Sequence, residues 1–173
     1  LMNLRPWKLW TLDGKPAEDT PQILATLESV LKRAPNHMGA NHYYIHAVEA
    51  SASPERALPS AARLETLAPA AGHLVHMPAH IYARTGDHAA AAKANLAGAN
   101  ADRVYLKDLP ADNYYGMAYY SHNLHFLADS DMMQGRLAEA QRAAAELSER
   151  ILPHADMMPM VELTTIHNKP IKT

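Results

Sequence analysis

One spacing recurs along this chain and constrains its fold more than any other feature. Pro35 and Pro69 lie 34 positions apart, and His42 is followed at the same interval by His76. Periods of this length are typical of solenoids, in which helical hairpins stack on one another and share a continuous core. The spacing therefore predicts an all-α fold, an αα-superhelix of stacked helical hairpins.

Helical periodicity fills most of the chain between the repeat markers. Ser53 should cap a helix that has Pro54 at its first position, and Gly86 and Gly135 should turn the chain between paired helices. Pro78 removes a backbone donor inside an expected helix and should kink it. We expect one domain over 1–173, with a partial repeat at 19–37, repeats at 38–71, 72–105 and 114–154, an irregular insert at about 103–113, and a helix from about 38 to 51.

Composition excludes several classes of protein. Lys and Arg number 16 against 18 Asp and Glu, and no basic run predicts a nucleic-acid surface. The sequence holds no apolar stretch long enough to predict a membrane span. The chain has no Cys, which excludes thiolate metal ligands and fits both a cytoplasmic and an exported protein, so the localisation stays open.

Residues at matched places in the repeats resemble the tetratricopeptide repeat (TPR) family. That family has a small residue at the hairpin turn, then an alanine, then a proline after the second helix. The matching residues are Gly86 with Ala91, Gly135 with Ala140, and Ala57 with Pro69. The aromatic residue that the family carries after the alanine is replaced by Ala61, Asn95 and Ala144. The resemblance implies a TPR-like superhelix over most of the chain.

Two stretches, at 42–49 and 72–82, are similar to a histidine-rich subfamily of larger bacterial TPR proteins. This resemblance implies a longer parent protein and brings no established activity. We therefore expect the chain to be a fragment, with Leu4, Trp7, Leu9 and Trp10 covering one end of the solenoid or packing on another copy in a homo-oligomer.

The histidines fall at repeated offsets from the repeat alanines. His42, His76 and His125 lie 15 positions before an alanine, His46, His80 and Asp129 lie 11 before, and Gly39, His73 and His122 lie 18 before. In TPR arrays such first-helix positions line the concave groove, and the resemblance implies the same here. The expected groove residues are His42, His46, Glu49, His73, His76, His80, Arg84, His122, His125 and Asp129.

Two histidine pairs have the spacing of metal ligands. Residues four apart share one face of a helix, so His42 with His46, and His76 with His80, each offer two nitrogens in one direction. Packed helices lie about 8–10 Å apart, close enough for both pairs to reach one ion. Nitrogen-rich ligands suit Zn, Cu, Ni or Fe and suit Mg or Ca poorly. The sequence predicts a transition-metal site at these four histidines as one hypothesis.

Three functions remain open from the sequence. The groove of a TPR-like module binds a protein or peptide segment without further assumptions, and this interpretation is favoured. The second hypothesis is a transition-metal-binding domain. The third is a metal-assisted enzyme, for which the chain has ligands but no recognisable nucleophile or catalytic motif, so no catalytic residue is assigned.

Overall fold

The structure is a computed structural model that describes residues 2 and 8–157. Over the described residues the protein is all-α and has no β-strand; Trp10 and Pro16 form an isolated bridge. No described helix is long and apolar enough to cross a membrane. The elements are α1 (Thr20–Arg33), α2 (Met38–Val48), the 3-10 helix η2 (Pro54–Ala57), α3 (Leu58–Leu67), α4 (Gly72–His76), α5 (Pro78–Arg84), α6 (His88–Leu106), the π-helix η3 (Gly116–Tyr120), α7 (Ser121–Met133), α8 (Leu137–Ile151) and the 3-10 helix η4 (Leu152–Met157).

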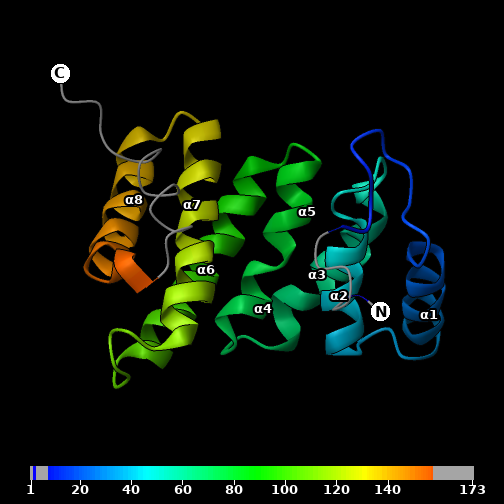
Figure 1. Ribbon diagram of the computed structural model, residues 1–173, viewed down its shortest axis with the longest axis horizontal. Coiled ribbons are helices and arrows are strands. Elements are labelled where there is room, and N and C mark those ends of the chain that lie inside the picture. The colour runs from blue at the N-terminus through cyan, green and yellow to red at the C-terminus, as the bar shows by residue number, and fades with distance from the viewer. Residues whose placement is uncertain (1, 3–7, 158–173) are drawn as a thin grey trace.

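The helices lie side by side in a row that follows their order in the sequence (Figure 1). Three hairpins are recognisable: α2 with α3, the broken helix α4–α5 with α6, and α7 with α8. The largest apolar cluster joins α1, α2, α3 and α5, and smaller clusters join α6, α7 and α8. The core therefore extends along the row and has no single centre.

Turn and cap residues explain where the hairpins reverse. Gly86 and Gly135 have φ of 85° and 71°, the left-handed region that favours glycine, and each precedes the second helix of a hairpin. The Asp87 carboxylate then accepts a hydrogen bond from the Ala90 N–H at 2.9 Å and caps α6. Alanines on α6, including Ala91 and Ala94, are buried and let α6 pack closely on its neighbours.

Three local predictions differ from the structure. Ser53 makes no side-chain capping bond, because η2 intervenes and α3 begins only at Leu58. The helix expected to end near residue 51 ends at Val48, where the Ser51 N–H bonds back to the Val48 carbonyl in a turn. The irregular insert was expected to begin at about residue 103, but α6 continues to Leu106.

Pro78 divides the first helix of the second hairpin into α4 and α5, as its missing N–H predicts. Met77 nevertheless keeps helical dihedral angles of −51° and −37°. The chain therefore bends without reversing, and side chains before and after Pro78 still face the same side.

Leu9 and Trp10, which precede α1, pack on the largest apolar cluster. Leu9 is buried against it, and the Trp10 indole Nε1 donates a hydrogen bond to the Ala47 carbonyl at 2.8 Å. Leu4 and Trp7, which were expected to join them, lie outside the described residues.

Close contact between α4 and α6 yields a stability prediction. A Cβ on Gly72 would lie 1.9 Å from Oδ1 of Asp102, a buried carboxylate that also accepts from the Tyr115 hydroxyl. Gly72→Ala should therefore destabilise the protein by about 1–3 kcal/mol, measured by urea unfolding. Gly39→Ala, whose nearest contact is a His37 atom at 3.5 Å, is the control and should be neutral or stabilising. Equal stability of the two variants would contradict this account of the contact.

Candidate metal centre

Six histidines from three hairpins gather at one place in the row. The first helices of the hairpins supply all of them: His42 and His46 on α2, His73 and His76 on α4, His80 on α5, and His122 on α7. Their nitrogen atoms form two groups in which three ligand atoms lie within 4.8 Å of one another, and Glu49 forms a third such group with His46 and His80.

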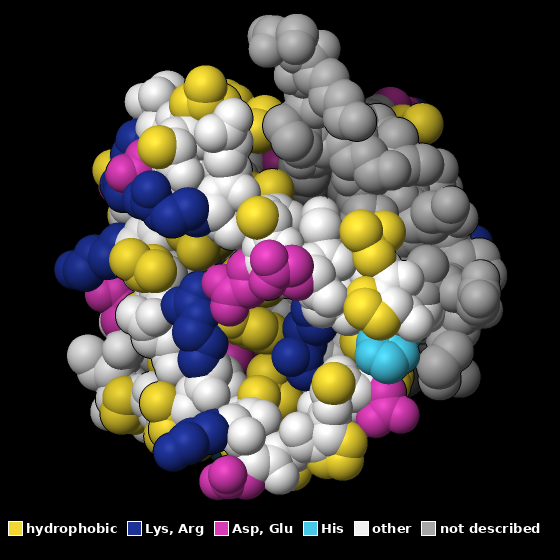
Figure 2. Space-filling model, turned by 90° about the vertical axis from the view of Figure 1, so that its left-hand side faces the viewer, with side chains coloured by type: hydrophobic (Ala, Val, Ile, Leu, Met, Phe, Trp, Pro, Cys, Tyr) yellow, Lys and Arg dark blue, Asp and Glu magenta, His cyan; other side chains and the backbone are white. Residues whose placement is uncertain are grey.

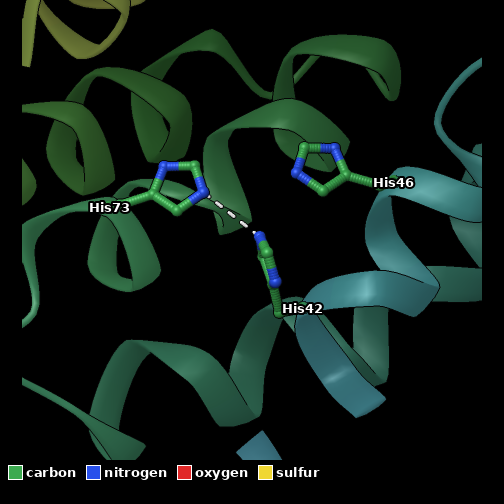
Figure 3. A group of neighbouring side chains, drawn as sticks. All are labelled: His42, His46 and His73. Atoms are coloured by element: carbon green, nitrogen blue, oxygen red, sulfur yellow. Dashed lines mark hydrogen bonds between the residues drawn. The ribbon is translucent and has the colours of Figure 1, made fainter. Parts of the chain in front are cut away.

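The first histidine group is His42, His46 and His73. Nε2 of His42 lies 3.1 Å from Nε2 of His73, and the rings of His42 and His46 meet edge to face with centroids 4.9 Å apart. Figure 3 shows the three imidazoles pointing toward one another across α2 and α4. Two of the three come from one hairpin and the third comes from the next.

The second histidine group is His76, His80 and His122. Nε2 of His80 lies 3.0 Å from Nε2 of His76 and 3.3 Å from Nε2 of His122. His76 is completely buried, and His80 is 6% exposed. Pro78 lies between His76 and His80 in the sequence, but the bend at this proline leaves their imidazoles in contact.

The two groups are built on one plan. His76 and His80 follow His42 and His46 by one repeat period, and in each group the third histidine comes from the next hairpin. His73 follows His42 by 31 positions and His122 follows His76 by 46, and the difference of 15 positions is the length of the insertion before α7. The second group is thus the repeat equivalent of the first.

Glu49 connects the groups through its carboxylate. Its Oε1 lies 2.8 Å from Nδ1 of His46, and its Oε2 lies 2.5 Å from Nδ1 of His80. Burial alone raises the pKa of Glu49, but hydrogen bonds from the two imidazoles outweigh it and lower that pKa to about 2. An ionised carboxylate only accepts hydrogen bonds, so both Nδ1 atoms carry a proton. In the neutral imidazoles, the Nε2 atoms then have the lone pair that a metal ion binds.

Asn95 fixes the orientation of His76 in the same way. The amide nitrogen of Asn95 donates to the Ser130 hydroxyl at 3.2 Å, and its Oδ1 lies 2.6 Å from Nδ1 of His76. The His76 Nδ1 therefore donates to this oxygen, which leaves Nε2 of His76 unprotonated. Partners of this kind on the far nitrogen are usual for histidines that bind metals.

In the neutral tautomers that Asn95 and Glu49 favour, His76 and His80 direct two lone pairs at each other over 3.0 Å. A proton or a metal cation between the two nitrogens relieves this repulsion. Burial opposes a proton on His76, whose pKa it lowers well below its usual value, and on His122, whose pKa it lowers to about 4. Two nitrogens bound to a tetrahedral zinc ion at about 2.0–2.1 Å are about 3.3 Å apart, close to both distances within this group.

The other predicted groove residues lie outside the two groups. His125 and Asp129 pair with each other at 3.5 Å, one turn further along α7. The Arg84 Nε donates to the Glu49 carbonyl at 2.9 Å, so its side chain is engaged with the backbone beside the site. Of the four histidines proposed from the sequence to share one ion, His42 and His46 belong to the first group and His76 and His80 to the second. His46 and His80 also lie together in the group that contains Glu49.

Sequence reasoning missed the roles of Asn95 and Tyr114. Asn95 occupies a repeat position at which the other hairpins have Ala61 and Ala144, and a single polar residue at an otherwise apolar position was the available signal. Tyr114 directly follows the irregular segment, where the repeat spacing is interrupted, so no matched position in another repeat drew attention to it.

A cavity of about 510 Å³ opens over both groups. Its floor contains Glu49 and all the grouped histidines except the fully buried His76. Its wall contains the aromatic rings of Tyr43, Tyr114 and Tyr119. Five of the six grouped histidines therefore line a cavity large enough for a small molecule.

A second cavity, of about 550 Å³, lies among α6, α7 and α8. On this end of the row, Figure 2 shows basic and acidic side chains interspersed around apolar ones. Three of its basic residues pair with acids of the same cavity: Arg103 with Glu146, Arg136 with Asp131, and Arg142 with Glu139. Its charges are largely balanced, and it contains no histidine.

The chain matches no protein-family model, no curated protein and no solved structure. Membership of the TPR family therefore stays a prediction from the sequence.

Proposed function

We propose that this protein is a transition-metal-binding domain that holds one ion in each histidine group. The observation that carries the proposal is the 3.0 Å contact between Nε2 of His76 and Nε2 of His80. The Nδ1 atoms donate to Asn95 and to Glu49, so in the neutral imidazoles neither Nε2 has a proton to donate to the other. The repeat equivalence of the first group extends the proposal to a second ion.

The ligand set favours Zn, Cu, Ni or Fe over Mg and Ca. Each group supplies three neutral imidazoles, which suit Zn, Cu, Ni and Fe, and supplies no oxygen ligands of the kind that Mg and Ca require. Three protein ligands leave at least one coordination position for a further molecule.

Metal analysis of variants tests the proposal. The tag-free chain, purified and then equilibrated with zinc, should contain two ions per chain. His42→Ala removes a ligand from the first group only, and His122→Ala removes one from the second only, so each should retain one ion. The double variant should retain none, while its helix content by circular dichroism stays unchanged.

His37→Asn is the matched control. His37 lies outside both groups and caps α2 by accepting from the Ala40 N–H, a role that Asn can also fill. This variant should bind two ions. Fewer than one ion in the wild-type chain, or two ions in the double variant, would refute the proposal and leave the peptide-binding module as the better hypothesis.

Peptide binding is the second candidate function because of the aromatic wall of the cavity. Tyr43 and Tyr114 are 46% and 73% exposed, and exposed aromatic side chains are enriched where proteins bind one another. A metal-assisted enzyme would use the same open coordination positions, and none of its catalytic groups is assigned here.

A further inference from the structure

The two proposed ions share one ligand cavity. All three members of the first group line it, as do His80 and His122 of the second. An ion with three protein ligands accepts a further ligand from the side that the protein leaves open. For both groups, the cavity of about 510 Å³ is the space in which that ligand can approach.

Charge selects the kind of ligand. Two divalent ions bring four positive charges to a floor of neutral imidazoles. Among the described residues that line the cavity, Glu49 alone carries negative charge, and its two oxygens accept from His46 and His80. A positive, partly enclosed floor attracts an anion and disfavours a cation.

The cavity wall selects for an aromatic or apolar body. Tyr119 is 38% exposed, lies edge-on to His73 with centroids 4.7 Å apart, and stacks on Tyr115 at 5.3 Å, so its ring is held in place beside the first group. Tyr114 contacts Tyr119 edge-on at 6.2 Å and continues the aromatic surface outward. A flat apolar ligand would bury these exposed rings.

We infer that the cavity binds a small organic anion with an aromatic body, whose carboxylate meets the metal ions while its ring packs against Tyr119 and Tyr114. The inference rests on the proposed metal binding and adds the class of ligand. The cavity volume lies within the range of about 300–1,000 Å³ that is usual for small-molecule sites.

Three probes separate the contributions of charge and ring. Benzoate has both, acetate has only the carboxylate, and benzamide has only the ring. Calorimetric titration of the full chain loaded with two zinc ions, at pH 7, should give benzoate at least about 10-fold higher affinity than either of the others. Without zinc, benzoate should bind at least about 10-fold more weakly.

A tyrosine variant tests the wall. Tyr119→Ala should lower the benzoate affinity to that of acetate and leave the acetate affinity unchanged. Tyr105→Ala is the matched control, because Tyr105 is 57% exposed and lies outside the cavity lining, so benzoate affinity should be unchanged.

The zinc content of the same samples distinguishes a failure of the ligand inference from a failure of the proposed metal binding. If zinc is present and benzoate binds no better than benzamide, or Tyr119→Ala leaves benzoate binding unchanged, the inference about the ligand is wrong and metal binding stands. If the chain holds no zinc, both are wrong.

Discussion

Glu49→Gln should abolish strong metal binding at one of the two histidine groups and spare the other. The carboxylate accepts from Nδ1 of both His46 and His80, whereas an amide has one accepting oxygen and one donating nitrogen. The imidazole that faces the amide nitrogen must offer Nδ1 as an acceptor and carry its proton on Nε2. That nitrogen is then lost as a ligand.

The expected loss at the affected group is about 10–100-fold in affinity, the usual effect of removing a partner that orients a metal-binding histidine. Zinc titration should show two tight ions in the wild-type chain and one tight and one weak ion in the variant. Glu65→Gln is the matched control, because Glu65 accepts from the Tyr82 hydroxyl away from the site and should leave both ions tight. Two tight ions in Glu49→Gln would show that the carboxylate does not orient the ligands.

The metal-free protein should lose stability as the pH falls from 7 to 5. Burial lowers the pKa of His42 to about 4 and of His73 to about 3, and neighbouring imidazoles add to both shifts. His122 is lowered to about 4 and His76 well below its usual value by the same causes. In the unfolded chain the pKa is about 6.5, so the unfolded state takes up protons first.

These histidines therefore do not reduce the free energy of unfolding above about pH 6.5. As the pH falls below 6.5 they reduce it progressively, down to about pH 4 for His42 and His122 and to about pH 3 for His73. At pH 5 the loss should be roughly 1–2 kcal/mol for each of the four, several kcal/mol together. Urea unfolding in the presence of a chelator at the two pH values measures it. His122→Asn should lose less between pH 7 and 5 than the wild type; equal free energies of unfolding at both pH values in the wild type would contradict the prediction.

Local signals in the sequence predicted much of the helical arrangement. Gly86 and Gly135 turn the chain as expected, and Pro78 divides a helix because it has no N–H to donate. Ser53 failed as a predicted cap because capping depends on which backbone N–H groups remain unpaired, and the 3-10 turn that follows it changes this. Residue type alone does not reveal such a turn.

The candidate site was partly visible in the sequence. The repeat spacing identified the pairs on α2 and on α4–α5, and His73 and His122 stood out at a matched offset. The offset assigns His73 to the same repeat as His76, but in space it completes the group of the preceding hairpin. That assignment depends on how adjacent hairpins are rotated, which a period in the sequence does not specify.

Each histidine group takes two nitrogens from one hairpin and the third from the next, so a bound ion would join neighbouring units of the row. In a row of stacked hairpins each unit contacts mainly its neighbours, so the contacts between units limit how far the row can deform. Two such ions would crosslink two successive interfaces, the one between the α2–α3 and α4–α6 hairpins and the one between the α4–α6 and α7–α8 hairpins. The metal supply would then set how far this protein can bend and twist, even at parts of its surface that touch neither ion.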